Sequence, residues 1–177
     1  MRFLLALLLA SACLRAADTT VVLVRHAERQ SLWNTDSPLA PAGLRRAQAL
    51  VPTLAAFHPV ALYTSDLQRT RQTLAPLAER LGLSPSAFAK GDSAGLAAAI
   101  LRDHRGQTVV VCWHHDLMKK LVRALGVAGP VPHWSLDSYG PLWIVRIPAA
   151  GPATLEVATQ APPEAVTPAA APAPALR

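Results

Sequence analysis

A chain of 177 residues has the length of one domain, since domains commonly contain about 100–200 residues. The formal net charge of +6 comes from 17 basic and 11 acidic residues, and 14 of the 17 basic residues are arginine. The basic residues are scattered and no Lys/Arg-rich run with interleaved aromatics occurs, which argues against a nucleic-acid-binding protein. Two cysteines exclude a disulfide framework and a four-cysteine zinc site.

Residues 1–16 are predicted to be a signal peptide. Arg2 is followed by an apolar run, Phe3 to Ala12, that is shorter than the about 20 residues a membrane-spanning helix needs. Two processing routes stay open: cleavage after Ala12 or Ala16, or lipidation of Cys13, which follows a segment similar to a bacterial lipobox. We therefore expect an exported protein, either periplasmic or anchored to the membrane only through a lipid on Cys13. A buried N-terminal helix is the alternative interpretation.

The other end of the chain is rich in alanine and proline. Residues 161–177 are predicted to be a disordered tail, because proline lacks an amide donor and alanine offers little surface to bury. Residues 153–159 alternate apolar and polar side chains and are predicted to be a last edge strand. The folded domain is therefore expected to span residues 17–160.

Between these ends, apolar strands alternate with amphipathic helices. Short apolar runs predict strands at residues 20–24, 60–64, 108–113 and 142–147. Apolar residues at helical spacing predict helices over residues 41–54, 67–81, 93–101 and 116–125. Gly82 and Gly126 are the predicted stop signals, and Asp116 is the predicted N-cap of the last helix. The alternation predicts a three-layer α/β/α fold with a mostly parallel central sheet.

Three of the predicted strands end in residues that suit phosphate chemistry. The first runs into Arg25 and His26, the second leads to a helix that carries Arg69, and the third runs into His114. Because open α/β sheets bind ligands beyond the carboxyl ends of their strands, we expect these side chains to converge. Arginine binds phosphate oxygens through paired hydrogen bonds, and neutral histidine is a nucleophile towards phosphorus. The sequence therefore predicts a phosphoryl-transfer site at this edge.

At these residues the chain resembles the histidine phosphatase superfamily, in its phosphoglycerate mutase-like branch. Residues 25–28 (RHAE) resemble the family's R-H-G/A-E segment, residues 63–73 its S-x-L-x-R-x-x-x-T segment, and residues 109–116 its strand-H-x-N/D segment. The resemblance covers about residues 21–125 and continues weakly to residue 147. It implies a phosphoglycerate mutase-like fold and a reaction without a metal or other cofactor.

Carried over residue by residue, the resemblance implies that His26 is the nucleophile that becomes phosphorylated. Arg25, Arg69 and His114 match the residues that surround the transferred phosphoryl group. Family members usually add an acidic residue that protonates the leaving oxygen, and here the candidates are Asp92, between the second and third segments, and Glu28, within the first.

Several neighbouring residues have two interpretations. Glu28 and His115 are candidate contacts to the phosphate or the substrate, and His115 is otherwise an ordinary, partly exposed histidine. Trp113, which is bulkier than the small residue usual there, either forms a wall of the pocket or packs beneath its rim. Arg71 is predicted to face solvent, and Cys112 is predicted to be an inert packing thiol.

A metal site is the competing interpretation of the same region, because histidine and carboxylate side chains are normal zinc ligands. The residues in question are His26, His114, His115 and Asp116. Adjacent His114 and His115 point to opposite sides of an extended segment, and the neighbouring arginines repel a dication. The metal-free interpretation is therefore favoured.

We expect a phosphoric monoester hydrolase of the EC 3.1.3 type that forms a phosphohistidine on His26. Only 42 residues separate His26 from Arg69 and 44 separate Arg69 from His114, so neither gap has room for a large cap insertion. Such an open site suits a phosphate carried on a small molecule, a glycolipid or a phosphoprotein. The alternatives are a protein phosphohistidine phosphatase and a non-catalytic phosphate-binding module of the cell envelope. The sequence predicts no oligomeric state.

Overall fold

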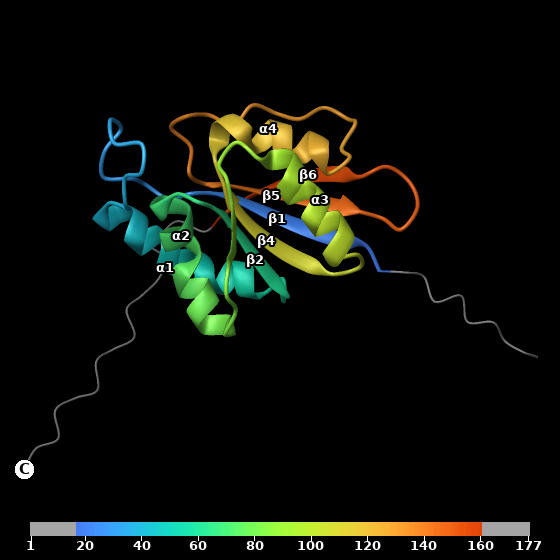
Figure 1. Ribbon diagram of the computed structural model, residues 1–177, viewed down its shortest axis with the longest axis horizontal. Coiled ribbons are helices and arrows are strands. Elements are labelled where there is room, and N and C mark those ends of the chain that lie inside the picture. Colours follow the sequence, from blue (N-terminus) through green and yellow to red (C-terminus); the bar gives the residue numbers. More distant parts are fainter. Residues whose placement is uncertain (1–16, 161–177) are drawn as a thin grey trace, which may run out of the picture.

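Residues 17–160, the part of the chain that this computed structural model describes, form six strands and four helices (Figure 1). The strands are β1 (Thr19–Arg25), β2 (Ala61–Ser65), β3 (Ser86–Phe88), β4 (Thr108–Trp113), β5 (Pro141–Ile147) and β6 (Thr154–Thr159). The helices are α1 (Pro41–Ala55), α2 (Gln68–Leu81), α3 (Ser93–Asp103) and α4 (His115–Ala124). The predicted signal peptide, with Cys13, and the predicted tail lie outside the described residues.

The strands form one mixed sheet in the order β3-β2-β4-β1-β5-β6. The pairs β3–β2, β2–β4 and β4–β1 are parallel, whereas β5 and β6 add as antiparallel strands at one edge. The predicted α/β fold with a mostly parallel sheet is confirmed, and so is the edge strand near residue 153. Strand β3 was not predicted.

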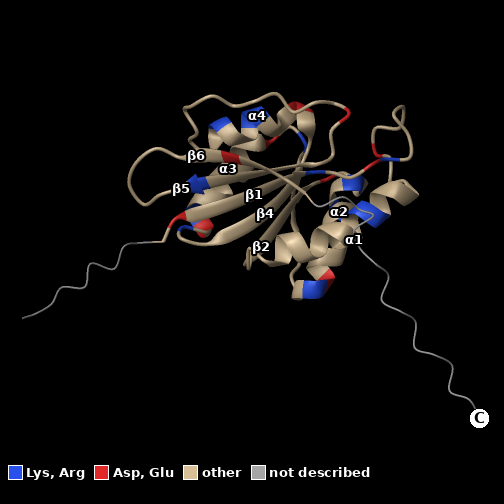
Figure 2. Cartoon of the chain, turned by 180° about the vertical axis from the view of Figure 1, so that it is seen from behind, with Lys and Arg blue, Asp and Glu red and all other residues tan. Residues whose placement is uncertain are grey.

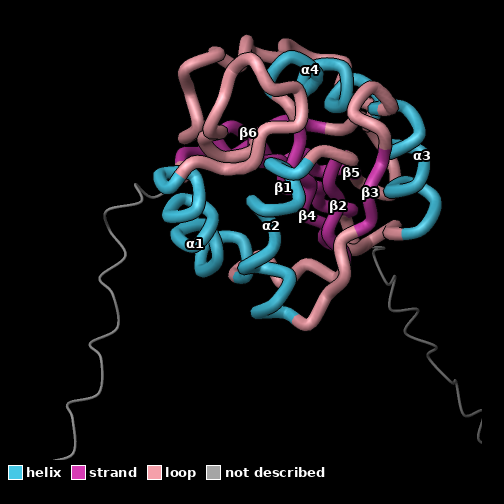
Figure 3. Tube along the Cα trace, turned by 60° about the vertical axis from the view of Figure 1, so that its left-hand side comes forward, coloured by secondary structure: helices cyan, strands magenta, loops and turns pink. Residues whose placement is uncertain are grey.

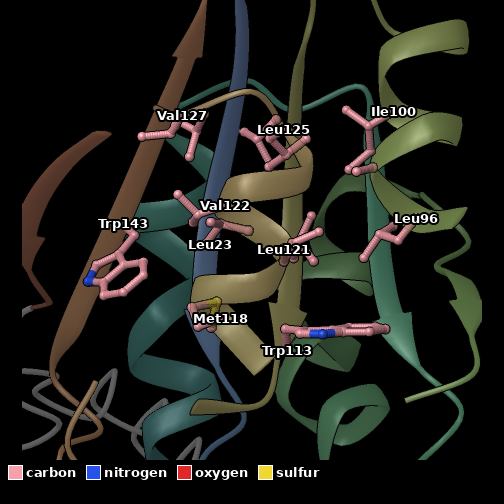
Figure 4. Packing of buried hydrophobic residues seen from close by; sticks show 14 of the residues in the cluster. Leu23, Leu96, Ile100, Trp113, Met118, Leu121, Val122, Leu125, Val127 and Trp143 are labelled. Carbon is pink, nitrogen blue, oxygen red and sulfur yellow. The ribbon is translucent and has the colours of Figure 1, made fainter. Parts of the chain in front are cut away.

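Alternation along the strands builds a separate apolar core on each face of the sheet. In β1, Val21 and Leu23 join the cluster under α3 and α4, while Val22 and Val24 join the cluster under α1 and α2. Figure 3 shows the strands between these two helix pairs. Figure 4 shows the first cluster, in which Met118 of α4 packs over the sheet. Because both faces are covered, the central strands are apolar throughout, as parallel strands usually are.

The helix ends follow local chemistry, with one correction to the sequence prediction. Gly82 ends α2 in the left-handed conformation with φ of 65°, as expected of a helix-terminating glycine. Asp116 is not the N-cap of α4: the helix begins at His115 with His114 as its N-cap, and Asp116 lies in its first turn. The prediction was wrong because an aspartate in the first turn also stabilises a helix start, so either position fits its preference.

The strand order brings the ends of the three strands with phosphate-binding-type residues together at the middle of the sheet. Strand β4 lies between β1 and β2, and Arg25 at the end of β1 pairs with Trp113 at the end of β4. The three segments that carry the phosphate-type residues therefore leave the sheet side by side, at the carboxyl ends of three parallel neighbours. Within residues 17–160, none of the helices combines the length and apolar character that crossing a membrane requires.

Candidate active site

A pocket of about 200 Å³ opens at the carboxyl ends of β1, β2 and β4. We call it the histidine pocket, and its wall consists of Arg25, His26, Arg29, Arg69, Lys90, His114, His115 and Asp116. The structure thus brings together His26, Arg25, Arg69 and His114, as the sequence analysis expected, and also places His115, for which two interpretations were open, in the wall. Figure 2 shows that the loops at this end of the sheet carry charged residues of both signs.

His26 is buried, with 3% of its surface exposed, and its tautomer is set by the backbone. The Nδ1 atom lies 2.8 Å from the carbonyl oxygen of Ala27, which can only accept, so Nδ1 carries the proton and donates. Burial, together with the positive charges of Arg69 and Arg25, lowers the pKa of His26 to about 3. The ring is therefore neutral near pH 7, and its Nε2 keeps a free lone pair.

His114 lies beside His26, with 5.4 Å between the ring centroids, and its tautomer is also set by its neighbours. Arg69 Nη2 donates to His114 Nδ1 over 3.4 Å, so the His114 proton is on Nε2 and is donated to Ser65 Oγ over 2.8 Å. The Ser65 hydroxyl lies 2.9 Å from Thr70 Oγ1, which continues the chain of hydrogen bonds into α2. Burial, with the adjacent His26 ring and Arg69, lowers the pKa of His114 to about 2.

Backbone carbonyls of a segment far along the sequence, in the loop between α4 and β5, hold the Arg25 side chain. Its Nη1 donates to the carbonyls of Leu136 and, over 3.0 Å, of Ser138. The Tyr139 ring lies against its guanidinium, with 4.1 Å from Cζ to the ring centroid. The loop between α4 and β5 therefore fixes Arg25 in the wall of the pocket.

Arg69 is held in a similar way from the other side of the pocket. Its Nη1 donates to the carbonyl of Thr35 over 2.7 Å, in the loop before α1. The Nε atoms of Arg25 and Arg69 are both buried and find no hydrogen-bond partner within residues 17–160. Buried unpartnered donors are costly, so two such guanidinium groups in one small pocket indicate a site for an anion.

Neither predicted proton donor lines this pocket. Asp92 is the N-cap of α3, and its carboxylate accepts from the Gly95 N–H over 2.8 Å. Burial raises the pKa of Glu28, but the hydrogen bonds from Arg46 outweigh it, so the pKa of Glu28 lies below its ordinary value and the group stays ionised. The carboxylate that does line the pocket belongs to Asp116, which lies 3.3 Å from Lys90 Nζ.

The remaining predicted residues divide between core and surface. Trp113 is fully buried in the core on the α3–α4 face, so it packs beneath the rim (Figure 4). Cys112 is buried in the core on the other face, and burial raises the pKa of its thiol. Arg71 is exposed, as predicted, and donates to the backbone carbonyl of Asp66.

Two residues of the pocket wall, Arg29 and Lys90, were not identified from the sequence, and neither was Tyr139, which contacts Arg25. Arg29 follows the first motif by one position, so it had the signal of a charged residue near a strand end. Lys90 lies in the loop between β3 and α3 and had no such signal, because β3 was not predicted. Tyr139 had no signal, because its contact with Arg25 depends on how the loop between α4 and β5 folds against the end of β1. In the part of the chain that the structure describes, no group of three or more His, Cys, Asp or Glu side chains is arranged to hold a metal ion.

Comparison with known proteins identifies relatives of this chain. The family model of the histidine phosphatase superfamily (branch 1) matches residues 21–90. An 8-oxo-(d)GTP phosphatase of Mycolicibacterium smegmatis (strain ATCC 700084 / mc(2)155) is 44% identical over 73 residues. That match covers 38% of this chain and 23% of the relative, so the chain spans less than a quarter of this protein.

Two solved structures show the same fold at low sequence identity. A mycobacterial glucosyl-3-phosphoglycerate phosphatase in complex with VO3 has a TM-score of 0.64 at 18% identity, covering 80% of this chain and 99% of its own. The protein histidine phosphatase SixA in complex with tungstate has a TM-score of 0.64 at 20% identity, covering 81% and 97%. These similarities establish a histidine phosphatase-like architecture.

Proposed function

We propose that the chain is a member of branch 1 of the histidine phosphatase superfamily, whose family model matches residues 21–90, and that it hydrolyses phosphate monoesters through a phosphohistidine on His26. One observation carries this proposal: the neutral, buried His26 shares a small pocket with Arg25 and Arg69, which form no ion pair with an acidic side chain within residues 17–160. A nucleophile and an anion-binding wall are the two parts that phosphoryl transfer requires.

In the first step, His26 Nε2 attacks the phosphorus atom of the ester. A P–N bond forms, the P–O bond to the leaving group breaks, and its electron pair goes to the leaving oxygen. Arg25 and Arg69 neutralise the charge on the oxygens that do not react. Since both guanidinium groups are already held by backbone carbonyls, they need little reorganisation during the reaction.

In the second step, water attacks the phosphohistidine. The P–N bond breaks, its electron pair returns to His26 Nε2, and the proton lost by the water is taken up by the group that served as the acid. The Nδ1–H bond to Ala27 keeps the ring in the required tautomer through both steps.

We assign the proton donor to Asp116. Within residues 17–160 it is the acidic side chain that lines the histidine pocket, where it is paired with Lys90, whereas Asp92 and Glu28 lie outside that lining. Its exposed position at the rim suits a group that exchanges protons with water and with the leaving oxygen.

The substrate belongs to the phosphorylated small molecules, glycolipids or phosphoproteins. The names of the related proteins, an 8-oxo-(d)GTP phosphatase, a glucosyl-3-phosphoglycerate phosphatase and a protein histidine phosphatase, support the small-molecule and protein parts of this range. The pocket of about 200 Å³ accommodates a phosphoryl group but little more. This supports a small phosphate ester as the smallest molecule that the site would hydrolyse.

The test is hydrolysis of an aryl phosphate by the parent and by His26→Ala, each with and without a chelator. We expect turnover by the parent that the chelator does not change, and loss of turnover in His26→Ala. Turnover that vanishes with the chelator would contradict the metal-free mechanism. No turnover of several phosphate esters by a folded parent would favour the non-catalytic binding module instead.

Export stays a proposal that rests on residues 1–16 of the sequence. Lipidation is tested by feeding cells a labelled fatty acid: we expect label in the parent and none in Cys13→Ser. Label in neither protein, with a mature N-terminus after Ala12 or Ala16, would instead support cleavage without a lipid.

A further inference from the structure

A second cavity, of about 320 Å³, adjoins the histidine pocket. The two cavities share Arg29, Arg69 and Lys90. The other residues that line the second cavity are Leu32, Thr35, Asp66 and Leu67. A molecule that places a phosphoryl group beside His26 would therefore lie next to this second cavity.

The charges around the two cavities exceed what a single phosphate needs. Within residues 17–160, none of Arg25, Arg29 and Arg69 forms an ion pair with an acidic side chain, whereas Lys90 is paired with Asp116. A phosphate monoester carries a charge of about −1.5 to −2 at pH 7, which matches two of the three guanidinium groups. Arg29, which faces both cavities, is left with its charge uncompensated.

The lining of the second cavity also contains more basic than acidic side chains, three of them shared with the histidine pocket. Its wall carries Arg29, Arg69 and Lys90 against the single carboxylate of Asp66. One oxygen of that carboxylate already accepts the Lys90 backbone N–H over 3.0 Å. Arginine groups without a carboxylate partner suit phosphate oxygens, which they bind through paired hydrogen bonds.

We propose that the second cavity binds a second phosphate, so that the substrates are molecules that end in two linked phosphates, such as nucleoside diphosphates. This inference rests on the proposed function for its chemistry but not for its binding geometry. His26 Nε2 attacks the terminal phosphorus and the bond to the bridging oxygen breaks. The electron pair stays on that oxygen, which becomes a terminal oxygen of the departing phosphate next to Arg29.

The binding test uses His26→Ala, which removes turnover, with orthophosphate and pyrophosphate as probes in calorimetry. We expect pyrophosphate to bind about tenfold more tightly than orthophosphate, the size of one added charge-assisted hydrogen bond. Adding Arg29→Gln should bring the ratio of the two affinities close to one. Adding Arg45→Gln, which removes the same charge from the exposed face of α1, should leave the ratio unchanged.

A second variant is expected to act in the opposite direction. Asp66→Asn removes the carboxylate from the second cavity and keeps an oxygen that accepts the Lys90 N–H. It should tighten pyrophosphate binding several-fold and change orthophosphate binding little. Equal affinities for the two probes, or an unchanged ratio in Arg29→Gln, would overturn the proposal.

Measuring turnover by the parent tests this inference separately from the proposed function. It also shows which kind of diphosphate, a nucleotide or a lipid precursor, the site prefers. The substrates are phenyl phosphate, adenosine diphosphate and a short prenyl diphosphate. A lower KM for a diphosphate than for phenyl phosphate supports the second phosphate site, and the better of the two diphosphates identifies the source. Phenyl phosphate hydrolysis without preference for either diphosphate contradicts this inference alone. If no ester is hydrolysed, the proposed function fails while the calorimetry still decides the phosphate site.

Discussion

His26 and His114 lie side by side, but their hydrogen bonds give them different roles. The Ala27 carbonyl fixes the proton of His26 on Nδ1 and leaves Nε2 free to attack. In His114 the proton is on Nε2, directed at Ser65, while Nδ1 accepts from Arg69. His114 therefore orients Arg69 and joins it to the β2–α2 segment, and His26 is the proposed nucleophile of the pair.

The assignment of Asp116 as proton donor predicts a dependence on the leaving group. In Asp116→Asn, hydrolysis of an alkyl phosphate should slow by about 10²–10⁴-fold, because an alkoxide leaves poorly without a proton. Hydrolysis of an aryl phosphate with an acidic phenol should slow far less. The measurement is kcat for both esters in parent and variant.

Asp92→Asn is the matched control for this prediction. Asparagine caps a helix as well as aspartate does, so α3 should stay intact and both rates should stay near those of the parent. Equal losses for both esters in Asp116→Asn would show that Asp116 has another role. An alkyl-specific loss in Asp92→Asn would restore Asp92 as the donor.

Among individual residues, the sequence identified those that belong to motifs and missed those whose contacts depend on how a distant loop folds. His26, Arg25, Arg69 and His114 follow strands within recognisable segments, so their convergence could be predicted. Tyr139, which contacts Arg25, lies more than 100 residues after it in the sequence, in the loop between α4 and β5. No local sequence pattern predicts a contact between residues so far apart. Asp92 was misleading because a carboxylate that caps a helix looks, in sequence, like a free one.

At the scale of elements, the approach of α1 to the first motif depends on a glycine. A Cβ on Gly43 would lie 2.2 Å from the carbonyl oxygen of Glu28, so no larger residue fits without moving the backbone. Gly43→Ala should destabilise the protein by about 1–3 kcal/mol and reduce turnover, since the displaced segment carries His26 and Arg29. Urea unfolding and aryl phosphate hydrolysis measure the two effects.

Gly91→Ala is the control for this prediction, because nothing lies within 4 Å of the position its Cβ would take. It should change neither the free energy of unfolding nor turnover by a comparable amount. A Gly43→Ala variant as stable and active as the parent would show that α1 and the first motif separate easily.

The start of α1 offers a stabilising substitution. Ala40 is the N-cap, with an extended backbone and no side-chain hydrogen bond to the helix, and Pro41 occupies the first turn. Ala40→Ser should raise the free energy of unfolding by about 1 kcal/mol, since a serine hydroxyl can accept a first-turn N–H. Urea unfolding checks the gain, and an unchanged or lowered stability would contradict it.

Helices and strands were predicted correctly where the spacing of apolar residues and the length of the segment both favoured the same kind of element. The apolar runs of β1, β4 and β5 and the helical spacing of α1 to α4 were sufficient to predict those elements. Strand β3, with the sequence SAF, is three residues long and has no alternation to detect. It is a strand because β2 offers a parallel edge, which is a tertiary cause.

At the scale of the whole molecule, the buried histidines make stability depend on pH. His26 and His114 have pKa values near 3 and 2 in the folded protein, against an ordinary value of 6.5. Below pH 6.5 the unfolded chain binds protons that the folded protein excludes, so the free energy of unfolding falls as pH falls. The slope is at most about 1.4 kcal/mol per pH unit for each histidine.

Urea unfolding between pH 7 and about pH 5 tests this linkage in a range where few carboxylates titrate. The parent should lose stability over that range, and His26→Asn should show a smaller loss because one excluded proton is gone. Saturating phosphate should raise stability by binding only the folded protein. Identical slopes in the parent and His26→Asn would contradict the low pKa of His26.

Strand order was the whole-molecule property that the sequence left open. Alternating strands and helices predict a mostly parallel sheet, yet several strand orders satisfy that pattern. The order found here puts β4 between β1 and β2 and so makes one pocket of three motif segments. The loop between α4 and β5 then lies against the same pocket, which supplies the carbonyls that hold Arg25.

The central claim is that the phosphoryl group passes through His26. The most direct measurement is rapid quenching of the parent with a labelled phosphate ester, followed by peptide mass spectrometry. The account predicts an acid-labile phosphoryl group on the peptide that contains His26, formed before phosphate release and absent in His26→Ala. A phosphoryl group on another residue, or release of phosphate by His26→Ala at the rate of the parent, would contradict it.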